Sequence, residues 1–322
     1  MAANRSLGRD IVIYLATDPT VSIGGGYTNP TFTKTTFLDS LDVLITHDLP
    51  LRVYKINDGR VRIQRTQDPL LPGEYGVESD GKYNWVRDVY KASKFTYYQG
   101  NIDVTDAPYY KRTSSAMSSL SASGRVRSFP AAVRDRDRRC VITGVSLTQR
   151  ELLLQRWTGY DAAHVFPVAL ESMFRNYNFG ELVVLDERDG SVNSPQNGLL
   201  LRKDVHGRFN QYEISINPND DYRIVCFLDD SLGLAGRQLD PICRDLEDPH
   251  HVNDNILFWH FQQAVLANMR GAGEPVFDED IPAGSDTMDA IISGPAPAER
   301  MEFELSSRLG DVMRAQGSLL IK

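Results

Sequence analysis

The chain has 322 residues, of which 41% are hydrophobic and 24% are charged, and its formal net charge is −8. These values are typical of globular proteins and exclude wholesale disorder or a fibrous repeat. The sequence has no run of about 18 apolar residues, which a membrane-spanning helix requires. The negative charge argues against a protein drawn to nucleic acid by its overall field, although a local basic patch can override that field.

The cysteines and the N-terminal residues indicate in which cellular compartment the protein is expected. Cys140, Cys226 and Cys243 are an odd number without a C-x-x-C pair, which indicates reduced thiols and argues against a zinc finger or ribbon. The first ten residues, MAANRSLGRD, lack the apolar core of a secretory signal. We therefore expect a cytoplasmic or nuclear protein with no membrane partner.

Residues 1–110 have the pattern of a small strand-rich domain. Apolar runs and a hairpin signal at 58–59 predict strands, and apolar residues at helical spacing predict one helix. The strands are expected at 9–16, 51–56 and 60–66, and the helix at 35–45. Three consecutive glycines at 24–26 suggest a phosphate loop, but no G-K-[ST] follows them, so we expect a plain loop.

Residues 111–127 form the predicted domain boundary. The stretch SSAMSSLSASG has six serines in eleven residues, a composition typical of a flexible linker. A helix at 129–139 follows, with Pro130 at an early position. Basic residues are concentrated from 111 to 139. They indicate either a phosphate-binding patch or a solvated helix face with Arg–Asp pairs.

Residues 128–322 mix helices and strands, so the predicted fold class is α+β with a strand-rich first domain and added C-terminal helices. Strands are expected at 161–166, 182–185, 198–202 and 222–227, with a further element at 286–292. Helices are expected at 168–177, 203–212, 253–269 and 298–309, the third of them amphipathic.

Two short segments carry the side chains suited to chemistry. In the first, DAAHVFP at 161–167, His164 lies on a strand that the proline ends. In the second, NGLLLRKDVHGRFN at 197–210, the first two residues form a hairpin-turn dipeptide before an apolar strand. Asp204 then stands at a helix N-cap position, and His206 and Asn210 project from one helix face. These features predict two strands packed on one helix.

These segments, with the opening CVITG at 140–144, resemble the HNH, or ββα-metal, endonucleases. The likeness is greatest to the HNH-domain proteins encoded by filamentous fungi. It extends through HFQQA at 260–264 and AERMEFE at 298–304, and residues 9–76 resemble the N-terminal domain of those proteins. The resemblance implies the fold more directly than the activity, because one fold hosts many functions.

The resemblance also implies roles for single residues. His164 would be the general base, Asn197 would hold the strand pair and orient His164, and His206 would bind one divalent ion, Mg²⁺ or Mn²⁺. The family's two other ligand positions are Ala163 and Asn210 in this sequence. Alanine cannot bind a metal, and a carboxamide is a weaker partner than a carboxylate for a hard cation. The implied metal site is therefore depleted.

Three functions remain open. The depleted ligand set in an acidic chain favours an HNH-fold enzyme that has left nuclease chemistry and needs no cofactor. It would bind a small organic substrate over the two strands, through Asp161, Arg202 and Asn210, and promote a cyclisation in fungal natural-product biosynthesis. The alternative is a divalent-metal-dependent endonuclease that cleaves DNA or RNA. The third is a catalytically silent interaction module.

Overall fold

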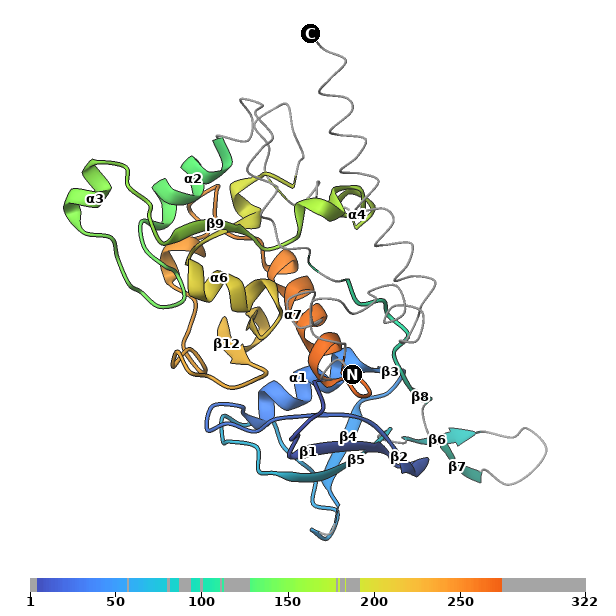
Figure 1. The fold of residues 1–322 in the computed structure, drawn as a ribbon. Helices are drawn as coiled ribbons and strands as arrows, with labels where there is room; N and C mark the ends of the chain where they lie inside the picture. Colours follow the sequence, from blue (N-terminus) through green and yellow to red (C-terminus); the bar gives the residue numbers. More distant parts are fainter. Residues whose placement is uncertain are drawn as a thin grey trace, which may run out of the picture.

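The computed structural model describes residues 5–56, 58–79, 82–86, 94–98, 101–110, 112, 128–177, 179, 183 and 192–273. Helices and strands are mixed in this part of the chain, as the α+β prediction requires (Figure 1). The serine-rich linker, apart from Arg112, and the elements expected at 286–292 and 298–309 lie outside the described residues, as does all but Val183 of the strand expected at 182–185.

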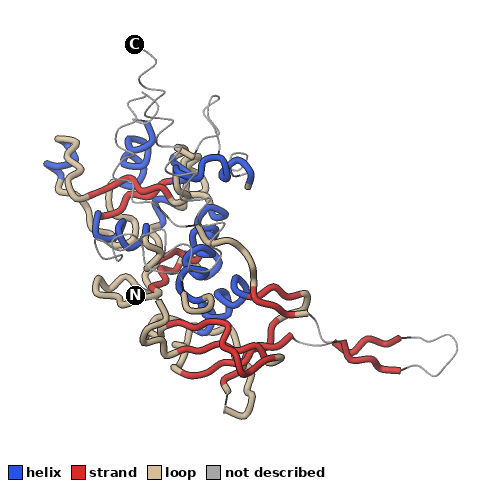
Figure 2. The backbone as a smooth tube through the Cα atoms, turned by 45° about the vertical axis from the view of Figure 1, so that its right-hand side comes forward, coloured by secondary structure: helices blue, strands red, loops and turns tan. Residues whose placement is uncertain are grey.

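The N-terminal half is built on a four-stranded sheet of order β2-β1-β5-β4, in which β1 and β5 are parallel (Figures 1 and 2). Two further strand pairs, β3–β8 and β6–β7, accompany it. The helix is α1 (Lys34–Leu44), and the strands are β1 (Ile11–Leu15), β2 (Asp18–Gly26), β3 (Ile45–His47), β4 (Leu51–Lys55), β5 (Gly73–Ser79), β6 (Lys82–Val86), β7 (Lys94–Tyr98) and β8 (Ile102–Val104).

The strand expected at 60–66 is wrong. Only an isolated bridge between Tyr54 and Arg62 forms there, and β4 pairs with β5 instead. The side chains from 60 to 66 are mostly exposed, and apart from Ile63, which packs on the N-terminal core, this segment buries little against the sheet. A strand is stabilised by side-chain packing on its neighbours, and the hairpin signal alone does not supply it.

The prediction of a plain loop at 24–26 is also wrong, because the three glycines end strand β2. A Cβ atom on Gly24 would lie 2.1 Å from the carbonyl oxygen of Met269, and one on Gly25 would lie 2.2 Å from that of Ile11. Glycine is therefore needed at Gly24, where the end of helix α7 (Asp254–Met269) meets the edge of the sheet.

We expect Gly24→Ala to lower the free energy of unfolding by about 1–3 kcal/mol, because the added methyl group must displace backbone. Gly207→Ala is the matched control, since Gly207 lies in a helix with nothing within 4 Å of its Cβ position. That change is expected to raise stability by about 0.5–1 kcal/mol. Urea denaturation of both variants tests this account, and equal stabilities for the two would contradict it.

The C-terminal half contains the paired strands β9–β10 and β11–β12, with helices around them. Its strands are β9 (Tyr160–His164), β10 (Gly198–Arg202), β11 (Ile214–Asn217) and β12 (Arg223–Cys226). Its helices are α2 (Ser128–Asp137), α3 (Gln149–Leu153), α4 (Glu171–Asn176), α6 (Lys203–Asn210) and α7 (Asp254–Met269). Short 3-10 turns precede α4, at Val168–Leu170, and β10, at Pro195–Asn197.

Helix α7 joins the cores of both halves (Figure 1). It begins where the prediction places it, after the N-cap Asn253, but it is buried on nearly all sides and is not amphipathic. Its first turns pack Ile256 and Trp259 with the strands β9–β12, and its later turns pack Phe261 and Val265 with the N-terminal sheet. A helix between two apolar layers needs apolar residues all round.

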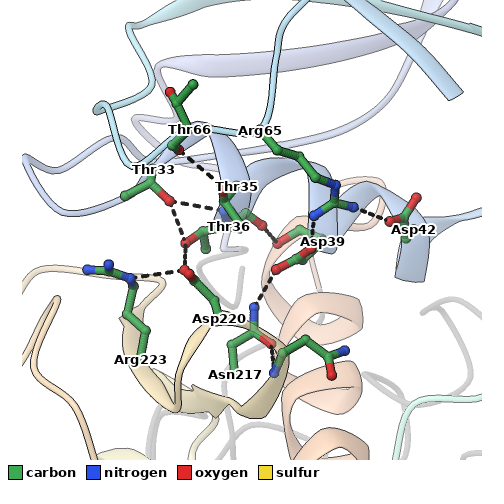
Figure 3. A network of polar contacts seen from close by, with 12 residues as sticks. Thr33, Thr35, Thr36, Asp39, Asp42, Arg65, Thr66, Asn217, Asp220 and Arg223 are labelled. Atoms are coloured by element: carbon green, nitrogen blue, oxygen red, sulfur yellow. Dashed lines mark hydrogen bonds and ion pairs between the residues drawn. The ribbon is translucent and has the colours of Figure 1, made fainter.

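Polar side chains also tie the two halves together beside α7 (Figure 3). Asp39 on α1 accepts hydrogen bonds from Arg65 and from Asn217 at the end of β11, the latter at 2.6 Å. Asp220 accepts from Thr36 at 3.5 Å and from Arg223 at 3.0 Å. Burial raises the pKa of Asp39. The hydrogen bonds from Arg65 and Asn217 act in the opposite direction and offset part of the cost of burying its charge.

Candidate active site

Strands β9 and β10 and helix α6 form the predicted unit of two strands and one helix. The strands are antiparallel, with His164 opposite Gly198 and Asp161 opposite Leu201. Asn197 and Gly198 do not form a hairpin turn, as the sequence suggested, because residues 165–197 separate the strands. Asn197 instead ends a 3-10 turn, and its side chain is fully buried.

The start of α6 also differs from the prediction. Arg202 occupies the N-cap position and makes no side-chain cap, while Asp204 lies in the first helical turn. The two side chains pair at 2.5 Å, and each is about two-fifths exposed. Asp204 also accepts a hydrogen bond from the backbone N–H of Val205. The carboxylate of Asp204 therefore accepts a backbone hydrogen bond within the first turn, where its negative charge also stabilises the N-terminal end of the helix.

Alternating side chains of β9 face two different helices. His164 stacks on the ring of Phe129 from α2, with ring centroids 3.9 Å apart and planes 10° apart. Ala163 points the other way, into the core that contains Val205 of α6. Asp161 lies on the same side as Ala163 and contacts α6. Within β9, His164 thus contacts α2, whereas Asp161 contacts α6, the helix that carries His206.

The imidazole of His164 is held in its neutral form. Its Nε2 atom lies 3.1 Å from Oδ1 of Asn193, so Nε2 carries the proton when it donates to that oxygen. Burial, with a smaller contribution from the charge of Arg112, lowers the pKa of His164 from 6.5 to about 4, although the hydrogen bond with Asn193 acts in the opposite direction. The ring is therefore uncharged at neutral pH, with a lone pair on its other nitrogen.

Arg112 binds the backbone at the end of β9. Its guanidinium donates to the carbonyl oxygens of His164 at 2.5 Å and Val165 at 2.7 Å. It also lies over the rings of Phe209 and Tyr212, 5.5 and 5.8 Å from their centroids. Arg112 belongs to the basic stretch at 111–139, but its side chain is buried against the end of β9 and is not free to bind phosphate.

Asn197 bridges the two ends of the long connection. Its Oδ1 accepts from the backbone N–H of Phe166 at 2.7 Å, and its Nδ2 donates to the carbonyls of Phe166 and Val192 at 3.0 and 2.8 Å. Val165 donates to the backbone carbonyl of Asn197. Asn197 thereby ties the segment after His164 to the start of β10. Asn193, four residues earlier, makes the direct contact with His164.

His206 lies between two of the other candidate residues. Its Nδ1 is 3.0 Å from Oδ2 of Asp161, and its Nε2 is 2.9 Å from Nδ2 of Asn210. The hydrogen bond from His206 lowers the pKa of Asp161, so this carboxyl is ionised at neutral pH. Asp161 fixes the proton of His206 on Nδ1, which leaves the Nε2 lone pair facing Asn210.

Arg136 in α2 and Arg139 just after it make their contacts within the fold. Arg136 pairs with Asp137 in the interior, and Asp137 also accepts from the backbone N–H of Leu200 at 2.7 Å. Arg136 donates to the carbonyl of Gly198 at 2.6 Å, and Arg139 pairs with Asp240. The described contacts show Arg–Asp pairing in this basic stretch, but Arg136 and Asp137 are buried and do not lie on a solvated helix face.

Burial of His164 makes the fold sensitive to acid. The unfolded chain takes up a proton on this ring near pH 6.5, whereas the folded chain does so near pH 4. The free energy of unfolding should therefore decrease as the pH falls from 6.5 to 4. We expect a weaker pH dependence in His164→Asn and an unchanged one in the exposed control His250→Asn, measured by urea denaturation at pH 7 and 5. An unchanged dependence in His164→Asn would contradict this.

Two hollows in the described part of the chain lie away from these residues, and one of them, of about 550 Å³, is lined by Leu147, Leu152 and Leu153 beside α3. A cavity of about 450 Å³ opens between the end of α1, residues 105–108 and α7, and Trp259 and His47 line it. None of the candidate site residues does so. Nor do the described residues include a group of three or more His, Cys, Asp or Glu side chains that could hold a metal ion. They form no helix long and apolar enough to cross a membrane.

Two family models match the chain. Residues 140–217 match a family described as HNH endonuclease, and residues 8–84 match a domain of unknown function, DUF8573. No curated protein and no solved structure matches the sequence. The first match includes His164, Asn197, His206 and Asn210. The C-terminal half therefore contains an HNH-family domain, and the sequence resemblance is confirmed at that level.

Proposed function

We propose that the HNH domain of this chain is a metal-dependent nuclease that hydrolyses phosphodiester bonds of DNA or RNA. The contact between Asp161 and His206 is the observation that carries this proposal. Ala163 removes one family ligand from the strand, but Asp161 stands two residues earlier on the same face. Asp161 places a negative charge beside His206, and the sequence pattern alone did not predict this contact.

His164 is the proposed general base. A base must be unprotonated to take a proton from water, and the lowered pKa of His164 provides this at neutral pH. Asn193 holds one ring nitrogen and Phe129 supports the ring face. These contacts fix the plane of the His164 ring. The lone pair on Nδ1 therefore keeps a fixed orientation. Positioning of this kind lowers the barrier to attack by the activated water.

The residues around His206 fit a divalent cation such as Mn²⁺ or Mg²⁺. His206 Nε2 and Asn210 Oδ1 would hold it once the Asn210 amide turns, and Asp161 would orient the imidazole through Nδ1. A carboxylate behind a metal-binding histidine is a frequent arrangement. Two protein donors leave most coordination positions to water and phosphate oxygens, as is usual for Mg²⁺. When bound, the ion would stabilise negative charge on the phosphoryl group.

Asp161→Asn tests this assignment, because it keeps the size of the side chain and removes its charge. We expect the metal concentration needed for half-maximal cleavage to rise about 10–100-fold. Asp204→Asn is the control, since Asp204 pairs with Arg202 and not with His206. Cleavage of labelled DNA and RNA over a Mn²⁺ series measures both. The same metal requirement in the two variants would contradict the proposed role of Asp161.

A second candidate is the metal-free enzyme for a small organic substrate, which would promote a cyclisation. The amide nitrogen of Asn210 at His206 Nε2 favours it, since this pair suits hydrogen bonding to a carbonyl as well as metal binding. Against it, the cavity of about 450 Å³ is lined by other residues. Failure of the folded protein to cleave nucleic acid with any divalent metal would favour this candidate.

Either function is proposed for the cytoplasm or nucleus of a fungal cell. The three cysteines are free and buried, which suits a reducing compartment. The fungal setting follows from the resemblance of the sequence alone.

A further inference from the structure

A short projecting element precedes the strand that carries His164. We call residues 145–159, which include α3, the α3 finger. Both views place α3 at the outer edge of the molecule (Figures 1 and 2). Thr148 and Glu151 form a complete capping box at the start of the helix. Gln155 adopts a left-handed conformation with φ 50° just after its end. The finger is therefore a defined structure and not a loose loop.

The tip of the α3 finger presents apolar side chains to solvent. Leu153 is 78% exposed and Leu154 is 55% exposed, and Val145 at its base is 44% exposed. Other large exposed apolar residues, such as Leu71 and Leu246, occur singly. Single exposed apolar residues are common on protein surfaces, whereas adjacent ones on a projecting element indicate a binding surface.

Cations flank this apolar tip. Arg150 and Arg156 are exposed on the finger. At its base Arg134 lies over Trp157, 5.3 Å from the ring centroid. The finger contains one acidic residue, Glu151, against two arginines, in a chain with a net charge of −8. This local positive charge next to leucines is complementary to a polyanion that also offers apolar surfaces, as stacked bases do.

We propose that the α3 finger enters a groove of duplex DNA beside the scissile bond, with Leu153 and Leu154 wedged against the bases and Arg150 and Arg156 on the phosphates. The proposal rests on the proposed nuclease function, and it names duplex DNA as the substrate form. Apolar wedges flanked by basic residues are known to open base steps and bend the duplex. The finger ends at Gly159, directly before β9, the strand that carries Asp161 and His164.

Binding and bending are measured on the full chain in EDTA, with a 30-base-pair duplex labelled at both ends. Wild type is expected to bind and to raise energy transfer between the end labels. The double variant L153S/L154S should bind roughly tenfold more weakly or worse and leave the duplex straight. Its thermal stability should be unchanged because both side chains are exposed. L71S, which alters an exposed leucine in the N-terminal half, should behave like wild type.

The arginines are tested by salt dependence. R150Q/R156Q should reduce the slope of log affinity against log salt concentration by about 2, one unit for each lost phosphate contact. Bending should persist in this variant at low salt, because the leucines remain.

Three results would overturn the finger assignment. One is unchanged binding and bending in L153S/L154S. Another is a protein dimer in sedimentation that L153S/L154S abolishes while duplex binding stays intact, which would assign the leucines to self-association. Failure of the nuclease proposal is distinguishable, because it appears as duplex binding without cleavage when Mn²⁺ is added. The third result is cleavage of duplex DNA at the wild-type rate by both finger variants. This result would leave the nuclease proposal standing and rule out the proposed role of the α3 finger.

Discussion

Cleavage of nucleic acid by His164→Ala is expected to be roughly 10²–10⁴-fold slower than by wild type at neutral pH. The substitution removes the neutral imidazole that Phe129 and Asn193 hold at the end of β9. Metal binding should persist, since the contacts that hold His206 come from Asp161 and Asn210 and do not involve His164. Single-turnover rates at saturating Mn²⁺ measure the effect on the chemical step.

His250→Ala is the control for that experiment. The His250 side chain is exposed, and its backbone carbonyl, which accepts from Arg136, is kept in the variant. Its cleavage rate should equal that of wild type. A His164→Ala protein that cleaves at the wild-type rate would remove His164 from the mechanism.

Asp137→Ala is expected to lower the free energy of unfolding by about 3–5 kcal/mol, the largest effect on stability that we predict. Asp137 is fully buried and accepts from Arg136 and from the backbone N–H of Leu200. Its loss leaves a buried guanidinium without its counter-charge and an N–H of β10 without its acceptor. Guanidinium denaturation monitored by circular dichroism measures the change.

Asp135→Ala is the matched control, since it is an aspartate of the same helix with an exposed side chain. Its effect should stay within about 0.5 kcal/mol. If the two variants were equally stable, the buried pair would not be the link between α2 and β10.

The unit of β9, β10 and α6 could be predicted because its information is local in the sequence. The run LLLR marks a buried strand, and the spacing of His206 and Asn210 places both on one face of a helix. The bounds of α1 and α7 were likewise predicted to within one residue from apolar spacing. Each of these features lies within a few residues of the element it defines.

The contacts around His164 could not be predicted, because they join distant parts of the chain. Phe129, Asn193 and Arg112 come from three segments that lie 29 to 52 residues from His164. The meeting of Asp161 with His206 spans 45 residues. Sequence spacing indicates which residues share a face, but the partner of each face depends on tertiary packing.

The role of glycine in β2 shows the same limit. A triple glycine usually indicates a loop, and only the close approach of Met269 to Gly24 explains its place in a strand. The basic stretch before Cys140 was open to two interpretations for a similar reason. Pairing of Arg136 with Asp137 depends on burial, which charge patterning does not reveal.

The central claim is that this HNH domain still cleaves nucleic acid, with His164 as base and Asp161 supporting His206. Its most direct test is nicking of supercoiled plasmid by the purified full chain with Mn²⁺, with Mg²⁺ and with EDTA, alongside His164→Ala. We predict nicking in the presence of metal that disappears in EDTA and in the variant. A folded wild-type protein that leaves DNA and RNA intact with every metal would contradict the claim and direct attention to small organic substrates.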